Sequence, residues 1–170
     1  MVLYVYKYVA PPELLRQRGA LIRTLAILSI MATAGPITIA QQKLKNNSSS
    51  RAAIRAVLDA QAAAWNRGDV EGYMDGYDRS PNAEFVGGDS ITRGWQEVLD
   101  RYKKKYDTRQ KMGVLTFSDL EITMLSKDAA IVLGRWRLKR ANDEPHGTFT
   151  LLFRKKKAGW RIVHDHSSSA

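Results

Sequence analysis

The stretch Gly147–Ser169, GTFTLLFRKKKAGWRIVHDHSSS, predicts two antiparallel strands joined by a tight, charged turn that contains a glycine. Successive side chains of a strand point to opposite faces, so the second strand has two different faces. One face carries His164 and His166, and the other carries Asp165 and Ser167. Ionisable groups on both faces favour a curved sheet with a pocket on one side and a partner on the other.

Helical patterns precede this hairpin and strand patterns surround it. Apolar residues recur at helical spacing in the first part of the domain, whereas the second part alternates as strands do. Helices followed by an antiparallel meander indicate an α+β fold with the helices on one face of the sheet. The expected helices are 52–66, 70–77 and 95–106, and the expected strands are 83–86, 90–92, 112–125, 129–139, 147–155 and 160–167.

The amino-acid composition excludes several classes of protein. The chain has 170 residues, of which 44% are hydrophobic, enough for one domain with a sizeable core. It has no cysteine, which excludes disulfides, thiol catalysis and cysteine-ligated zinc. The formal net charge is +10, but the basic residues form no motif typical of nucleic-acid-binding proteins. We therefore expect a solvated basic surface and no nucleic-acid partner.

Residues 1–40 have the three-part pattern of a secretory signal peptide. A basic region precedes an apolar run at 24–31, and small residues stand at the positions that a signal peptidase reads before Ala40. A membrane anchor is the alternative, but the run is shorter than the roughly 20 residues that span a bilayer. We expect cleavage after Ala40, a periplasmic or secreted product off the membrane, a polar linker at 41–50 and one domain at 51–170. The long aromatic beginning indicates a start codon assigned too far upstream.

Five segments follow one another in a characteristic order. They are AWNRGDVEGYMDGY (64–77), AEFVGG (83–88), TRGWQEV (92–98), FSDLEITMLSKDAAIVLGRWRL (117–138) and the terminal hairpin. Together they resemble the SnoaL-like, ketosteroid-isomerase-like proteins of the nuclear transport factor 2-like superfamily. The branch that the chain resembles most consists of small secreted bacterial domains of unknown function.

This resemblance covers 51–169 and implies a fold. We expect three helices packed into a strongly curved antiparallel sheet that encloses a conical pocket. The family usually forms homodimers through the outer sheet face, so we also expect a homodimer here. The apolar residues considered for whichever face is not the pocket are Trp136, Phe149, Phe153, Trp160 and Ile162.

The last strand also resembles that of the association domain of calcium/calmodulin-dependent kinase. Pocket-lining arginines of that domain correspond to Arg135, Thr150 and Ser167, and only the first is arginine here. The correspondence implies that Asp165 faces the pocket. The strand pattern alone does not decide which face of the strand lines the pocket. We then expect Arg135 and Asp165 to form a bidentate ion pair that lowers the pKa of Asp165.

Candidate site residues follow from this arrangement. Asp165 is the best candidate for a catalytic acid or base, although the alternative is that it and Arg135 only satisfy each other. A histidine pair on one strand is too few ligands for a catalytic zinc, so we expect neither a metal nor a cofactor. Aromatic residues considered for the pocket wall are Trp65, Tyr73, Tyr77, Trp95 and Trp136. The predicted ligand-binding residues are Trp65, Tyr73, Trp95, Arg135, Thr150 and Asp165.

Two classes of function fit these features. The first is an exported domain that binds a small molecule in a conical pocket. The alternative is an acid–base enzyme of isomerase, cyclase or dehydratase type acting on a small organic substrate in the same pocket. A wholly apolar cone favours binding, whereas an open cone with an unpaired carboxylate favours catalysis.

Overall fold

The computed structural model describes the backbone of residues 12–170 and the side chains of residues 38–170. The chain divides into two compact units, Met1–Lys45 and Asn46–Ala170. Residues 1–11 of the expected signal peptide at 1–40 lie outside the described backbone, and residues 1–37 lie outside the described side chains. Within the part that the structure describes, none of the helices is both long and apolar enough to cross a membrane.

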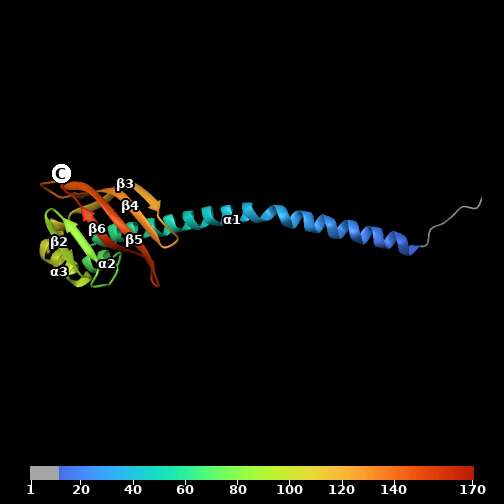
Figure 1. Cartoon of the computed structure of the whole chain (residues 1–170). Coiled ribbons are helices and arrows are strands. Elements are labelled where there is room, and N and C mark those ends of the chain that lie inside the picture. Colours follow the sequence, from blue (N-terminus) through green and yellow to red (C-terminus); the bar gives the residue numbers. More distant parts are fainter. Residues whose placement is uncertain (1–11) are drawn as a thin grey trace, which may run out of the picture. The chain divides into compact units, whose positions relative to one another are not determined.

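The order of elements follows the sequence pattern (Figure 1). The described residues form four helices, with α4 an addition to the three that were expected. The helices are α1 (Pro12–Asn66), α2 (Val70–Met74), α3 (Trp95–Lys105) and α4 (Arg109–Met112). The strands are β1 (Glu84–Gly87), β2 (Ser90–Arg93), β3 (Val114–Met124), β4 (Ala129–Lys139), β5 (His146–Lys156) and β6 (Gly159–Ser167).

Residues 41–50, expected as a polar linker, are helical and lie inside α1. The segment contains neither glycine nor proline, so nothing in it stops a helix that flanking turns have already nucleated. Ser50 is accordingly a helix-interior residue and not an N-cap. The helix ends at Asn66 as expected, and Gly68 just beyond it has a φ of +89°. Asp69 caps α2 by accepting a 2.7 Å hydrogen bond from the Gly72 amide.

The six strands form one sheet in the order β2-β1-β6-β5-β4-β3. The α+β class is confirmed, but the sheet is mixed, because β1 runs parallel to β6 while the other neighbouring pairs are antiparallel. The cause lies just before β1. Tyr77 already forms a parallel bridge with Ile162 of β6, so the chain enters β1 running in the same direction as β6.

A bulge in β6 changes which residues share a face. Phe153 pairs with Ile162, but the preceding Leu152 pairs with His164, so Val163 is an extra residue in the ladder. Ile162 and Asp165 therefore both point inward, three positions apart. Strict alternation, which put Ile162 on the face of His164, is wrong across this bulge.

The inner face of the sheet carries the hydrophobic core. Ile54 and Leu58 of α1 are fully buried, as is Phe153 of β5. The residues considered for a dimer face belong to this interior instead. Four of them are at most 4% exposed, and the fifth, Trp136, lines the cavity described below. They lie on β4, β5 and β6, and burying their large apolar area beneath the helices stabilises the domain.

Candidate ligand pocket around Asp165

A cavity of about 340 Å³ lies between the helices and the inner face of the sheet. Its wall consists mostly of aromatic and aliphatic side chains, which is typical of sites for small organic molecules. The aromatic lining comprises Trp65, Tyr73, Tyr77, Phe85, Tyr102, Tyr106, Phe117, Trp136 and Phe149, and the aliphatic lining comprises Leu115, Leu138, Leu151 and Ile162.

Asp165 is the one carboxylate in this lining among the described residues. Its neighbours in the sheet are Phe85 on β1 and Leu151 on β5, both apolar, and its own exposure is only 3%. Two hydroxyls approach it. Tyr77 Oη donates to Oδ2 over 2.5 Å, and Ser167 Oγ donates to Oδ1 over 2.6 Å.

The Tyr77 hydroxyl reaches Asp165 because the loop after α2 is tied to β6. The Ile162 amide donates to the Gly76 carbonyl over 2.9 Å, and the Asp78 amide donates to the Ile162 carbonyl over 2.8 Å. These bonds lie on either side of Tyr77 and next to the bulge at Val163. The bulge at Val163 therefore turns Asp165 inward. Next to it, the amide and carbonyl of Ile162 bond to the loop that carries Tyr77.

Tyr77 belongs to an aromatic cluster centred on Tyr73. Tyr73 lies 6.1 Å from Tyr77 between ring centroids and 5.4 Å from Tyr102, and Trp65 packs edge-on against Tyr73 at 5.1 Å. Burial, together with the charge of Asp165, raises the pKa of both Tyr73 and Tyr77 above the ordinary value of a phenol. These tyrosines therefore remain neutral hydroxyl donors over the working range of any protein.

Burial also raises the pKa of Asp165 above its ordinary value, and the hydrogen bonds from Ser167 and Tyr77 offset only part of that rise. The expected lowering of this pKa by Arg135 is wrong. Arg135 lies on the outer face of β4, pairs with Asp119 over 3.1 Å, and its side chain is 62% exposed. The residues that alternate with it, Gly134 and Trp136, face inward, so no cation reaches Asp165 from this strand.

Only part of the predicted ligand-binding set meets at the cavity. Trp65, Tyr73 and Asp165 line it, whereas Arg135, Thr150 and Trp95 do not. Thr150 lies on the outer face of β5, opposite exposed His166. Arg135 and Thr150 point outward because each is next in sequence to a residue that points inward, Trp136 and Leu151 respectively.

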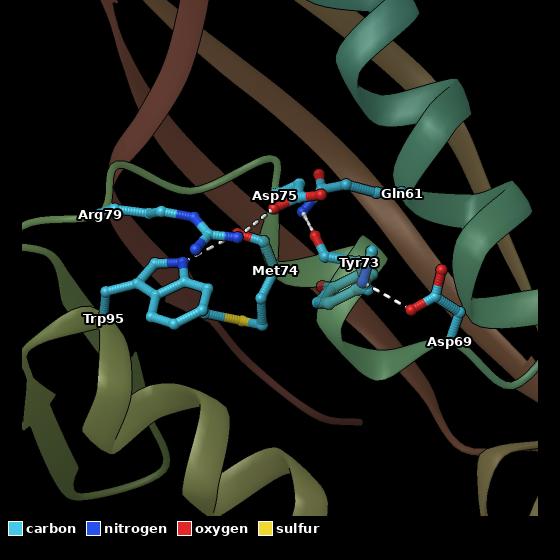
Figure 2. Close-up of polar contacts among 8 residues, drawn as sticks. Gln61, Asp69, Tyr73, Met74, Asp75, Arg79 and Trp95 are labelled. Atoms are coloured by element: carbon cyan, nitrogen blue, oxygen red, sulfur yellow. Dashed lines mark hydrogen bonds and ion pairs between the residues drawn. The ribbon is translucent and has the colours of Figure 1, made fainter.

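Trp95 lies outside the lining and contacts the C-terminal end of α2 (Figure 2). Its indole Nε1 donates over 2.9 Å to the carbonyl of Met74, the last residue of α2. On the other side of this short helix, Gln61 Nε2 donates over 2.9 Å to the carbonyl of Tyr73. Asp69 caps the first turn of the same helix. α2 is thus held at both ends, which fixes the position of the Tyr73 ring.

His164 and His166 stay out of the cavity, as the kinase comparison implied. His164 lies opposite Glu84 in the sheet and forms a 3.1 Å contact with its carboxylate, which Arg93 also contacts at 2.9 Å. Among the described residues, no three metal-ligating side chains come together.

Comparison with known proteins agrees with this geometry. Residues 54–170 match the model of the SnoaL-like domain. The chain belongs to this family. A solved NTF-2 like protein of unknown function from Shewanella oneidensis MR-1 shares 44% identity and superposes with a TM-score of 0.67, covering 69% of this chain and 98% of that one.

Two more distant structures share the fold of this SnoaL-like domain. A ketosteroid isomerase-like protein from Erwinia carotovora atroseptica SCRI1043 is 21% identical with a TM-score of 0.56, covering 69% of this chain and 94% of its own. A nuclear transport factor 2-like superfamily protein from Salmonella enterica serovar Typhimurium LT2 is 22% identical with a TM-score of 0.58, covering 72% and 92%. No curated protein matches the chain in sequence.

Sequence reasoning missed two cations of the SnoaL-like domain that line the cavity, Arg101 and Lys105. They lie four residues apart on α3, and this spacing puts them on one side of the helix. The signal was present in the segment RYKKKY (101–106), where two tyrosines stand among four basic residues. It was interpreted as a solvated basic cluster because the contact with the sheet was not foreseeable from α3 alone.

Proposed function

We propose that this SnoaL-like domain binds a small organic molecule in the cavity and that Asp165 performs acid–base chemistry on it. One observation carries the proposal: the carboxyl group of Asp165 is 3% exposed and lines an open aromatic cavity, and its hydrogen-bond partners among the described residues are two hydroxyls and no cation. Structural carboxylates at such depth are normally neutralised by a cation. A carboxyl group that lacks one is a candidate for function.

The chemistry follows from the environment of Asp165. Burial raises the pKa of Asp165, which brings its uptake and release of a proton closer to neutral pH than in a free aspartate, and this direction of shift suits an acid–base catalyst. Tyr73 and Tyr77 remain protonated, so either hydroxyl can donate to an oxygen that becomes negative during the reaction. This combination suits proton transfer next to a carbonyl group. The ketosteroid isomerase-like structure shares the fold alone, so the proposal rests on these residues.

Binding without chemistry is the second candidate, and a specific observation favours it. Both oxygens of Asp165 already accept a short hydrogen bond, one from Tyr77 and one from Ser167. A carboxylate held in this way can serve to position a tyrosine and need not exchange protons with a ligand. The two candidates differ in whether a bound ketone exchanges its acidic carbon-bound hydrogens.

Hydrogen exchange on a bound ketone tests the proposal. The probe is 2-tetralone in D₂O, with deuterium incorporation beside the carbonyl followed by proton NMR and binding followed by saturation transfer. The wild-type protein should accelerate the exchange, and Asp165→Asn should lose about 10²-fold or more of that acceleration, the usual contribution of a general base. The matched control is Asp119→Asn, which removes an exposed carboxylate from the far face of the sheet.

Three outcomes are informative. Exchange lost in the Asp165 variant and kept in the Asp119 variant supports acid–base chemistry. Equal exchange in all three proteins excludes Asp165 as the base. Binding of the ketone without any acceleration favours the second candidate.

We further propose that the protein is exported and acts as a homodimer. The apolar run and the small residues before Ala40 support export. For the dimer, the support is Leu133 at the middle of β4, which is 46% exposed on the outer face of the sheet, with half-buried Ile131 and Leu152 beside it.

A further inference from the structure

Arg101 and Lys105 are the two cations in the lining of the cavity. Neither forms an ion pair with any carboxylate of the described residues. Arg101 Nη1 donates instead to two neutral hydroxyls on β2, Ser90 Oγ at 3.0 Å and Thr92 Oγ1 at 2.7 Å. These bonds orient the guanidinium without neutralising its charge.

Both cations are placed against aromatic rings. The guanidinium carbon of Arg101 lies 5.1 Å from the centroid of Phe85, and Lys105 Nζ lies 5.4 Å from that of Tyr106. These distances allow cation–π attraction, which further restricts where the two charges sit. Because Arg101 and Lys105 are one helical turn apart on α3, the charges lie on the same side of that helix.

The remainder of the lining is apolar or neutral apart from Asp165. Asp165 takes its hydrogen bonds from Tyr77 and Ser167, and neither Arg101 nor Lys105 is among its partners. The cavity therefore has two distinct polar regions, an unneutralised cationic one on α3 and a carboxyl group on β6. Aromatic rings line the space around both of them.

We infer that the natural ligand is a small organic carboxylate with an aromatic or other apolar ring, whose acid group binds Arg101 and Lys105. A planar carboxylate matches the geometry of the Arg101 guanidinium. It would also supply the negatively charged partner that Arg101 lacks among the described residues. The ring then contacts the aromatic wall. This inference rests on the proposed function, because it names the class of ligand that the same cavity takes.

The experiment compares an acid with its neutral isostere. The probes are 2-naphthoate and 2-naphthamide, and their dissociation constants are measured by the fluorescence change of the pocket tryptophans. We expect the acid to bind about tenfold tighter than the amide, the gain typical of one charge-assisted contact. Inorganic phosphate at equal ionic strength should not displace it, because phosphate lacks the ring.

Substitutions in α3 test which side chains bind the acid group of the ligand. Lys105 is exposed and makes no side-chain hydrogen bond, so Lys105→Gln keeps the fold intact and should reduce the preference for the acid about threefold. Arg101→Gln should remove most of the preference while amide binding persists, which shows that the pocket still folds. Lys104→Gln, a neighbouring exposed lysine outside the lining, is the matched control and should change nothing.

Each result bears on the inference. Equal affinities for acid and amide, or an acid preference that survives both substitutions, overturn the carboxylate class while leaving the small-molecule pocket in place. Displacement of the acid by inorganic phosphate shows general anion attraction and also overturns it. Binding of neither probe contradicts the inference together with the binding function on which it depends.

Discussion

The hydroxyl of Tyr77 donates a 2.5 Å hydrogen bond to the buried carboxyl group of Asp165, across 88 positions of sequence. This contact joins the loop after α2 to the last strand, and no cation takes part in it. Its consequence is a carboxyl group whose pKa lies above the ordinary value, because burial outweighs the two hydroxyl donors.

Replacing Asp165 should make stability less dependent on pH. The folded-state pKa exceeds the ~3.9 of the unfolded chain, so the folded protein binds more protons between the two values and stability falls as pH rises through that window. Asp165→Asn abolishes this loss. We expect the variant to be more stable than wild type near pH 8, with a smaller difference near pH 4.

Urea denaturation of both proteins at the two pH values measures this effect. His164 and His166 on the outer face also lower the pKa of Asp165 when they are charged, and both histidines, with the Glu84 and Arg93 partners of His164, are unchanged in the variant. A variant less stable than wild type near pH 8 would mean that the carboxylate is stabilised by a charge in the folded state.

Gly76 should not tolerate a side chain. A Cβ atom at this position would overlap the end of the Gln61 side chain, which is 2% exposed and held by the Tyr73 carbonyl. We expect Gly76→Ala to cost about 1–3 kcal/mol. Combining it with Gln61→Ala should cost less than the sum of the two single changes, because the overlap disappears.

Thermal denaturation of the two single variants and the double variant measures the coupling. Strict additivity would show that Gln61 does not fill the space beside Gly76.

Much of this fold was predictable because its signals are local. The helix ending at Asn66, its stop at Gly68 and the cap at Asp69 follow from residue types that act within one turn. The strands of the meander are recognised by their alternation, and their observed ends lie close to the predicted ones. Such patterns need no knowledge of distant contacts.

The site was less predictable because it depends on register. The extra residue at Val163 leaves no trace in the sequence, yet it decides which side chains of β6 meet Ile162 on the inner face. Arg135 was placed beside Asp165 from a corresponding position in another protein family, and the register of β4 points it outward to Asp119. Tyr77 was identified only as an aromatic residue, because its partner lies far along the chain.

The outer face of the sheet should mediate dimerisation. Leu133 is 46% exposed at the centre of this face, and Leu133→Glu would place a charge in the proposed interface. We expect a dimer for wild type and a monomer for the variant in light scattering at micromolar concentration. Ile91→Glu, at an equally exposed apolar position on edge strand β2, is the control and should remain dimeric. A wild-type monomer would contradict the proposal.

Export should remove the segment that precedes Gln41. Intact-mass analysis of the protein purified from its native host should give a mature chain that begins after Ala40. Ala40→Phe should block processing at this position, because signal peptidases require a small residue there. A cytoplasmic protein whose mass still includes Met1 would exclude export.

The pKa of Asp165 is the most direct test of the account. In protein labelled with ¹³C at aspartate Cγ, the Asp165 resonance is identified by its loss in Asp165→Asn and then followed through a pH titration. We predict a midpoint above the ~3.9 of a free aspartate, and a higher one still in Tyr77→Phe, because the phenol hydrogen bond lowers this pKa. A midpoint at or below ~3.9 would contradict the account, since it would require a cation beside Asp165 or a solvated carboxylate.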